Sequence, residues 1–164
     1  MPVSWHIELT GSKLPAPVGD SAFTFTLVNI HTDPDEVASE VNALDDVFRA
    51  VQRTGVEDDV ILLGDLNASA SQLGDLARIP NISWTVNGQP TNTLGTESYD
   101  NILFDAAASR EFTNAAGILD LGAAYSLTED EALDVSDHRP VWAEFSALEH
   151  RDGRIASGPG EPRR

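Results

Sequence analysis

The stretch VILLGDLN, residues 60–67, decides how this chain folds. Its first four residues are apolar without a break, which is the pattern of a short strand covered on both faces. Gly64 ends the apolar run, and Asp65 and Asn67 follow it directly. Loops at the edge of a rigid sheet commonly carry catalytic groups, so Asp65 and Asn67 are candidate site residues.

Upstream of this stretch the pattern predicts a strand and then a helix. Residues 22–29 are rich in aromatic and β-branched side chains, which favour a strand. Asp33 is expected to cap a helix in which Pro34 takes the first position and Glu36 closes a capping box. Apolar residues then recur at helical spacing over residues 37–51, and Gly55 suits the end of the helix.

Downstream the expected elements are shorter. The sequence predicts a weaker helix over residues 71–78 and a loop over residues 87–98, which is dense in Gly, Pro, Asn and Thr. Further strands are expected over residues 82–86, 99–104, 115–121 and 141–145. These elements together predict an α/β (α+β) fold.

Composition limits the chemistry that such a domain can perform. The 164 residues, 41% of them hydrophobic, suffice for one domain with a core. The formal net charge of −17 repels nucleic acid and anionic membranes unless cations intervene. The absence of cysteine excludes disulfides and thiolate metal sites, and oxygen-rich ligation favours magnesium, calcium or manganese. No apolar run is long enough to cross a membrane.

The two ends of the chain suggest how the domain is bounded. Residues 3–9 already alternate like a strand, so part of the domain is expected to be missing upstream. After Leu148 the sequence becomes charged and rich in Gly and Pro, and we predict a domain over residues 1–148 with a disordered tail over residues 149–164. A complete chain without a signal would be cytoplasmic, whereas a lost upstream signal would allow export.

A second polar motif, SDHRP at residues 136–140, stands just before the last predicted strand. His31 follows one strand and Asp100 begins another, so strands running in opposite directions within one mixed sheet would bring all these groups to the same edge. The resulting set comprises His31, Asp65, Asn67, Asp100, Asp137 and His138. Carboxylates that hold a divalent ion, an amide donor and paired histidines suit the attack of water at phosphorus.

Each motif alone has an ordinary structural explanation. Asp65 and Asn67 are equally typical of a turn in which both side chains bond the nearby backbone, and the motif at residues 136–140 is equally typical of a turn ended by proline. A histidine at a strand end is commonly structural. The functional hypothesis therefore depends on the whole set.

Five motifs occur in the order found in the endonuclease/exonuclease/phosphatase family. They are VNIHTDP at residues 28–34, EVNALDDV at residues 40–47, GDLNA at residues 64–68, YDNI at residues 99–102 and SDHRPV at residues 136–141. The chain resembles deoxyribonuclease I most within that family, over residues 22–145. The resemblance implies half of a four-layer α/β sandwich, namely the C-terminal half, with a mixed, mainly antiparallel sheet and helices on one face.

The resemblance also implies roles for the candidate residues. His31 and His138 resemble the general acid and base, and Asp100 resembles the carboxylate that orients a catalytic histidine. Asn67 resembles the amide that holds the scissile phosphate. Asp65 and Asp137 resemble metal ligands or water-orienting groups, and the metal would be Mg²⁺ or, alternatively, Mn²⁺ or Ca²⁺. Thr91 and Thr93 lie in a loop where the family contacts phosphate, but their spacing does not match cleanly, and no role is assigned to them.

The family's first half, with an early Asn and a Gln-Glu motif whose glutamate binds metal, has no counterpart here. Glu8 lacks the context of that motif. The sequence thus predicts a metal-dependent, DNase I-like nuclease that is weakly active or inactive as this chain. Its substrate would be nucleic acid or another phosphodiester bound through metal, without a membrane. An exposed sheet face would self-associate or receive a complementing N-terminal half.

Two alternatives of other classes stay open at this point. In the first, the chain is a non-catalytic remnant that acts as a binding half-domain. In the second, it is a phosphatase or lipid phosphodiesterase of the same family, since the loops that set specificity lie mostly outside the motifs.

Overall fold

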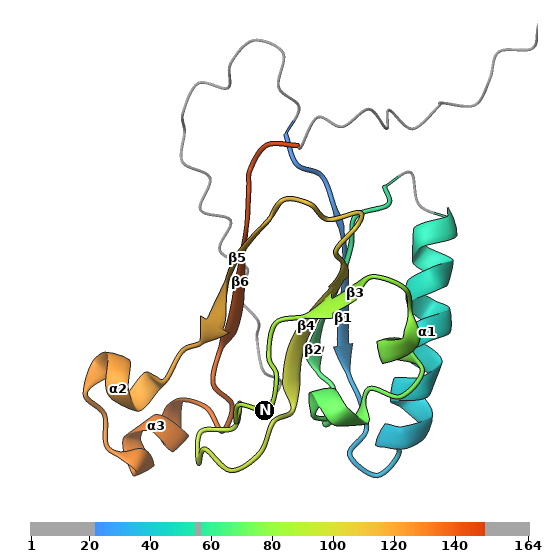
Figure 1. Cartoon of the computed structure of the whole chain (residues 1–164). Helices are drawn as coiled ribbons and strands as arrows, with labels where there is room; N and C mark the ends of the chain where they lie inside the picture. The colour runs from blue at the N-terminus through green and yellow to red at the C-terminus, as the bar shows by residue number, and fades with distance from the viewer. Residues whose placement is uncertain (1–21, 55–56, 150–164) are drawn as a thin grey trace, which may run out of the picture.

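The computed structural model describes residues 22–54 and 57–149 (Figure 1). The strand predicted over residues 3–9, Glu8, the helix stop at Gly55 and the tail beyond residue 149 lie outside this part of the chain. Within it, a central sheet is covered by a long helix on one face and by a two-stranded sheet on the other. The predicted α+β class is confirmed.

The central sheet has four strands in the order β1-β2-β4-β3. The strands are β1 (Thr26–His31), β2 (Val60–Asp65), β3 (Ile82–Trp84) and β4 (Asp100–Asp105). β1 and β2 are parallel, whereas β4 runs antiparallel to both of its neighbours. The sheet is therefore mixed and mainly antiparallel, as the sequence predicts.

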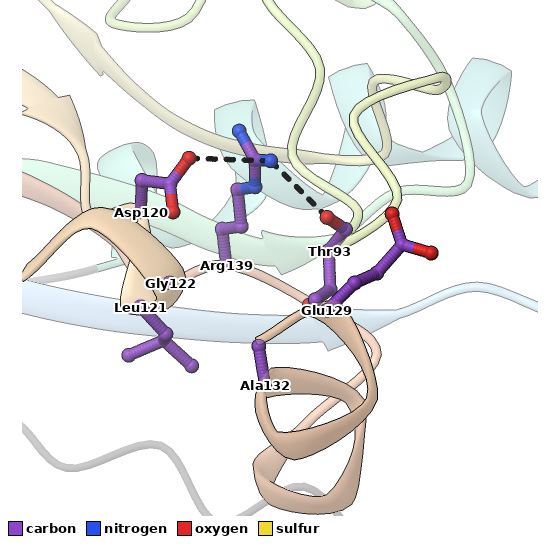
Figure 2. Close-up of a pocket in the computed structure, with 7 residues that line it drawn as sticks. All are labelled: Thr93, Asp120, Leu121, Gly122, Glu129, Ala132 and Arg139. Carbon is purple, nitrogen blue, oxygen red and sulfur yellow. Dashed lines mark hydrogen bonds and ion pairs between the residues drawn. The ribbon is translucent and has the colours of Figure 1, made fainter. Parts of the chain in front are cut away.

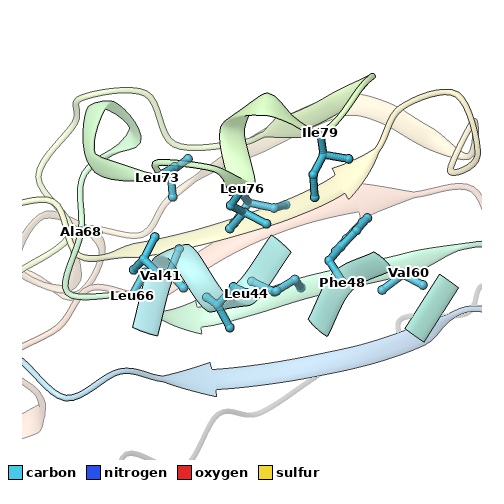
Figure 3. Close-up of a cluster of buried hydrophobic side chains, with 11 residues drawn as sticks. Val41, Leu44, Phe48, Val60, Leu66, Ala68, Leu73, Leu76 and Ile79 are labelled. Atoms are coloured by element: carbon cyan, nitrogen blue, oxygen red, sulfur yellow. The ribbon is translucent and has the colours of Figure 1, made fainter. Parts of the chain in front are cut away.

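Helix α1 (Val37–Thr54) covers one face of this sheet. Val41, Leu44 and Phe48 recur at intervals of three and four residues and are buried against the strands (Figure 3). Strand β2 contributes Val60 and Leu62 to the same core, so the apolar run is indeed covered. The full buried cluster comprises Val41, Leu44, Phe48, Val60, Leu62, Leu66, Ala68, Leu73, Leu76, Ile79 and Leu103.

The opposite face of the sheet packs on β5 (Phe112–Ile118) and β6 (Val141–Phe145), which pair antiparallel. Phe104 of β4 is buried there, with its ring 4.8 Å from that of Phe112 and 5.3 Å from that of Phe145, measured between centroids. The sequence leads us to expect an apolar face opposite the helix, and this pair of strands covers part of it. The arrangement is that of a DNase I-like half-domain, with helix, sheet and partial second sheet as successive layers.

Several boundaries differ from the sequence predictions. Helix α1 begins at Val37 because the chain first makes a turn, in which Asp33 accepts from the backbone of Asp35 instead of capping the helix. The helix predicted over residues 71–78 is two 3₁₀ segments, Ala70–Gln72 and Leu76–Arg78, because Gly74 between them has a φ of +54° that no α-helix contains.

The last third of the chain contains two short helices that the sequence does not predict, α2 (Leu121–Tyr125) and α3 (Glu129–Val135). Strand β5 begins three residues earlier than expected, and Leu121 belongs to α2. None of the helices in the described residues is long and apolar enough to cross a membrane.

Candidate active site

The pairing register of the central sheet places three candidate residues side by side. His31, the last residue of β1, is paired with Asp65, the last residue of β2. Asp65 is in turn paired with Asp100, the first residue of β4. Parallel β1 and β2 end where antiparallel β4 begins, so the three side chains share one edge of the sheet, as the sequence predicts.

His138 comes to this edge from the segment before β6. Its Nδ1 lies 2.8 Å from Oδ2 of Asp100, and its Nε2 lies 3.7 Å from Oδ2 of Asp65. His31 approaches Asp65 from the other side, with its Nε2 3.6 Å from the same oxygen. The His138 side chain is largely buried, whereas that of His31 is 71% exposed. Two imidazoles therefore flank one carboxylate.

The backbone around Asp65 explains why this motif needs its glycine and asparagine. Gly64 has a φ of +137°, and a Cβ at that position would lie 1.9 Å from the carbonyl oxygen of Ile30 on the neighbouring strand. Asn67 has a φ of +45°, a left-handed conformation that asparagine tolerates well. The backbone N–H of Asn67 donates to Asp65 Oδ1, and the side-chain Nδ2 of Asn67 donates to the backbone carbonyl of Thr32.

Asp100 is held by residues that sequence analysis did not assign. The side chain of Asp100 is 1% exposed, and the backbone N–H groups of Asp100 and Tyr99 both donate to Oγ1 of buried Thr91. Oδ1 of Asp100 is buried and has no hydrogen-bond partner among the described residues. Thr91 thus fixes the backbone that carries the Asp100 carboxylate, while one of that carboxylate's oxygens is left for a further ligand.

Asp137 lies next to this cluster without joining it. Its side chain is exposed, and its backbone carbonyl accepts from the N–H of Thr93 at 2.7 Å. At this edge of the sheet, Asp65, Asp100 and His138 have ligand atoms within 4.8 Å of one another. The structure therefore brings five of the six candidates into direct neighbourhood, and Asp137 stays a predicted ligand at its margin.

Arg139 is the residue of this region that sequence analysis missed. Its guanidinium Nη2 lies 3.3 Å from Oδ2 of Asp120 and donates to the carbonyl of Thr93 at 3.1 Å (Figure 2). These contacts tie the loop at residues 91–97 to the start of α2 and line a cavity of about 180 Å³. The only feature of the sequence that could have pointed to Arg139 is its position next to His138. Its partners, Asp120 and Thr93, come from distant segments of the chain.

The surroundings of His138 change its protonation. The hydrogen bond to Asp100 raises the pKa of the imidazole above its ordinary 6.5, burial opposes this, and the charges of Asp100, Asp65 and Asp137 raise it further. A histidine with a carboxylate on Nδ1 keeps the tautomer in which Nε2 can accept a proton. The geometry therefore suits His138 to general-base chemistry.

The titration of His138 by NMR, in the metal-free chain, is expected to have its midpoint above pH 6.5. Because folding raises this pKa, the matching contribution to the free energy of unfolding is present below pH 6.5 and is lost as the pH rises through the folded-state value. Asp100→Asn should lower the midpoint, since it removes the largest cause of the shift. A midpoint that Asp100→Asn leaves in place would contradict this assignment.

The donor set at the edge fits a divalent cation. Asp65, Asp100 and His138 offer two carboxylates and an imidazole within reach of one another, and the buried Oδ1 of Asp100 has no other partner among the described residues. Mg²⁺ and Mn²⁺ are bound by such oxygen-rich sets. Asp137, at the margin of the cluster, is the further carboxylate that would complete such a set.

The fold and the edge cluster together define a DNase I-like half-domain. Comparison with known proteins agrees. The chain is 35% identical over 132 residues to human Deoxyribonuclease-1-like 1, which covers 74% of this chain and 44% of that protein. It is 36% identical over 143 residues to Deoxyribonuclease-1-like 1 of Chlorocebus aethiops, covering 81% and 46%. It is 33% identical over 136 residues to rat Deoxyribonuclease gamma, covering 74% and 43%.

These similarities show that the chain is related to the DNase I-like proteins. The chain spans less than half the length of the relatives that it matches. No family model matches the sequence. The resemblance read from the five motifs is thereby confirmed as a relationship, while the roles of the individual residues stay predictions.

Proposed function

We propose that the edge cluster is a centre for divalent-metal-dependent hydrolysis of phosphodiester bonds in DNA. The observation that carries this proposal is the position of His138, which contacts Asp100 through one nitrogen and faces Asp65 with the other. The names of the relatives, deoxyribonucleases throughout, favour DNA over a phosphomonoester or a lipid.

In this proposal the two histidines move protons. Asp100 accepts from Nδ1–H of His138, which leaves Nε2 free to take a proton from the attacking water. His31 lies on the other side of Asp65, and its proposed role is to give a proton to the leaving oxygen. Nδ2 of Asn67 uses one of its two hydrogens on Thr32, and the other remains for a phosphate oxygen.

Asp65 and Asp137 are the proposed metal ligands, with Mg²⁺ as the ion and Mn²⁺ or Ca²⁺ as alternatives. When bound, the ion would neutralise charge that develops on the phosphoryl oxygens. Asp65 also fixes the loop that carries Asn67, because its Oδ1 accepts from the Asn67 N–H. Replacing Asp65 should therefore disturb both ion binding and phosphate positioning.

The chain alone is proposed to have little activity, because groups that act as a unit lose most of their rate when one member is missing. Nicking of supercoiled plasmid by the isolated chain should be slow, should require Mg²⁺ and should stop with a chelator. Asp65→Asn should lower the remaining rate by about 10²-fold or more. The matched control is Asp46→Asn, an exposed carboxylate of α1 with the same loss of charge.

Nicking that ignores the chelator and both substitutions would show that the activity comes from another source. A rate that falls equally in Asp65→Asn and Asp46→Asn would show that net charge matters and that the edge cluster does not.

We also propose that a complementing segment packs on the exposed outer face of the second sheet. In the described residues that sheet has two strands only, and Trp142 on its outer side is 46% exposed. β6 alternates, so that Val141, Ala143 and Phe145 face the central sheet while Trp142 and Glu144 face outward. Such a partly covered aromatic face suits another layer of the same domain.

A chimera with a full-length relative tests this proposal. In human Deoxyribonuclease-1-like 1, the segment that matches this chain is exchanged for residues 22–149 of this chain, and the rest of the relative supplies the complementing segment. The chimera allows the proposed centre to be assayed in a full-length setting. Gel filtration of the isolated chain distinguishes a complementing segment from self-association. A chain that self-associates would elute as a dimer, and a chain that needs a complementing segment would elute as a monomer.

A further inference from the structure

Three carboxylates gather at the end of the central sheet opposite the candidate active site. Asp59 directly precedes β2, Glu111 directly precedes β5, and Glu149 follows β6. Their ligand atoms lie within 4.8 Å of one another. β2 has six residues and carries Asp65 at its far end, so about 20 Å separates the two groups of side chains.

Two members of this cluster are deeply buried. Asp59 is 5% exposed and Glu111 is 3% exposed, although both carry a carboxyl group. Burial raises the pKa of Asp59 to about 7, the nearby Ser109 hydroxyl lowers it in part, and the charges of Glu111, Glu57 and Asp58 raise it further. Burying a carboxylate such as that of Asp59 costs free energy unless the group is paired, protonated or bound to a cation.

The hydrogen bonds of this region leave oxygens without partners. Oδ1 of Asp59 is buried and has no hydrogen-bond partner among the described residues. Ser109 is 1% exposed, its Oγ likewise has no such partner there, and its hydroxyl lies close enough to Asp59 to affect that pKa. Unsatisfied buried polar atoms of this kind commonly mark an ion or water that the protein binds.

The donor atoms indicate which ligand fits. All are oxygens, from carboxylates and a hydroxyl, and hard cations prefer such sets. Ca²⁺ takes six to eight oxygens at about 2.3–2.6 Å, so ligand atoms across one ion lie up to about 5 Å apart. The observed spacing of at most 4.8 Å is compatible with a single Ca²⁺.

We propose that Asp59, Glu111 and Glu149 bind a calcium ion that fastens the second sheet to the central sheet. Asp59 comes from the central sheet, whereas Glu111 and Glu149 flank the two strands of the second sheet. Glu149 is itself oriented by Thr24, whose backbone N–H donates to its Oε1 at 3.0 Å. The ion would bridge the two layers beside their shared aromatic cluster.

The test is a titration of the full chain with CaCl₂, followed by calorimetry and by backbone amide NMR shifts. Amides at residues 59–60, 109–112 and 146–149 should shift together. Asp59→Asn and Glu111→Gln should each weaken Ca²⁺ binding at least tenfold and remove those shifts. Asp46→Asn should leave the affinity within twofold. Asp65→Asn, at the other end of the sheet, should leave these amide shifts intact.

Thermal unfolding keeps the test decisive if one variant folds poorly. A chelator should lower the melting temperature of Asp65→Asn, which lacks a proposed ligand of the candidate active site, and should have no further effect when Glu111→Gln is combined with it. The proposal is overturned if the amides at residues 59–60 and 109–112 do not respond to Ca²⁺. It is equally overturned if Asp58→Asn weakens binding while Glu111→Gln does not, since the ion would then lie on residues 57–59 alone.

Discussion

His138→Ala in the chimera is expected to lower the rate of DNA cleavage by about 10² to 10⁴-fold, the range that a positioned general acid or base contributes. The His138 side chain makes the hydrogen bond to Asp100 and faces Asp65, and alanine removes both contacts together with the nitrogen that would accept the proton. The measurement is the initial rate of plasmid nicking at saturating Mg²⁺.

The control for this substitution is Asp100→Asn, which keeps the shape of the contact but removes its charge. That variant should retain the fold and lose less activity than His138→Ala, and the acidic limb of its pH profile should move to lower pH because the His138 pKa falls. A His138→Ala rate within threefold of the unmodified chimera would refute the assignment of this residue.

Gly64→Ala is expected to destabilise the chain by about 3 kcal/mol or more, from left-handed backbone strain together with overpacking. The added Cβ would lie 1.9 Å from the Ile30 carbonyl oxygen, so β1 and β2 must separate where His31 pairs with Asp65. Activity in the chimera should fall as well, because the same displacement moves both side chains. Urea unfolding followed by circular dichroism measures the change in the free energy of unfolding.

Gly88→Ala provides the matched comparison. Gly88 also has a positive φ, +79°, but a Cβ there would meet nothing within 4 Å. Its cost should stay near the strain alone, about 1 kcal/mol. Equal losses for Gly64→Ala and Gly88→Ala would show that the close approach of the two strands does not constrain this motif.

The sequence predicts that His31, Asp65 and Asp100 share one edge of the sheet, because strand polarity is enough to bring them there. His31 and Asp65 follow apolar strands, and Asp100 begins one, so a mixed sheet brings them to one edge without knowledge of any side-chain contact. The hydrogen bond between Asp100 and His138 links residues 38 positions apart. From the sequence, only the resemblance to the endonuclease/exonuclease/phosphatase family indicated that Asp100 orients a catalytic histidine.

What the sequence does not predict depends on contacts between distant segments. Thr91 supports Asp100 through its hydroxyl, and Arg139 joins the loop at residues 91–97 to Asp120, but neither residue stands out by pattern. Asp59 and Glu111 are ordinary acidic residues in the sequence, and only tertiary packing buries them together. Gly74 likewise interrupts the helix expected over residues 71–78, because its φ is positive, and the pattern of neighbouring residues does not predict that angle.

The most direct test of the central claim is plasmid nicking by the chimera in Mg²⁺, compared with the isolated chain. We expect the chimera to cleave DNA at least a hundredfold faster than the isolated chain, and we expect a chelator to stop this cleavage. A correctly folded chimera that does not cleave DNA in Mg²⁺ would show that the cluster of His31, Asp65, Asp100 and His138 is not a working phosphodiesterase centre.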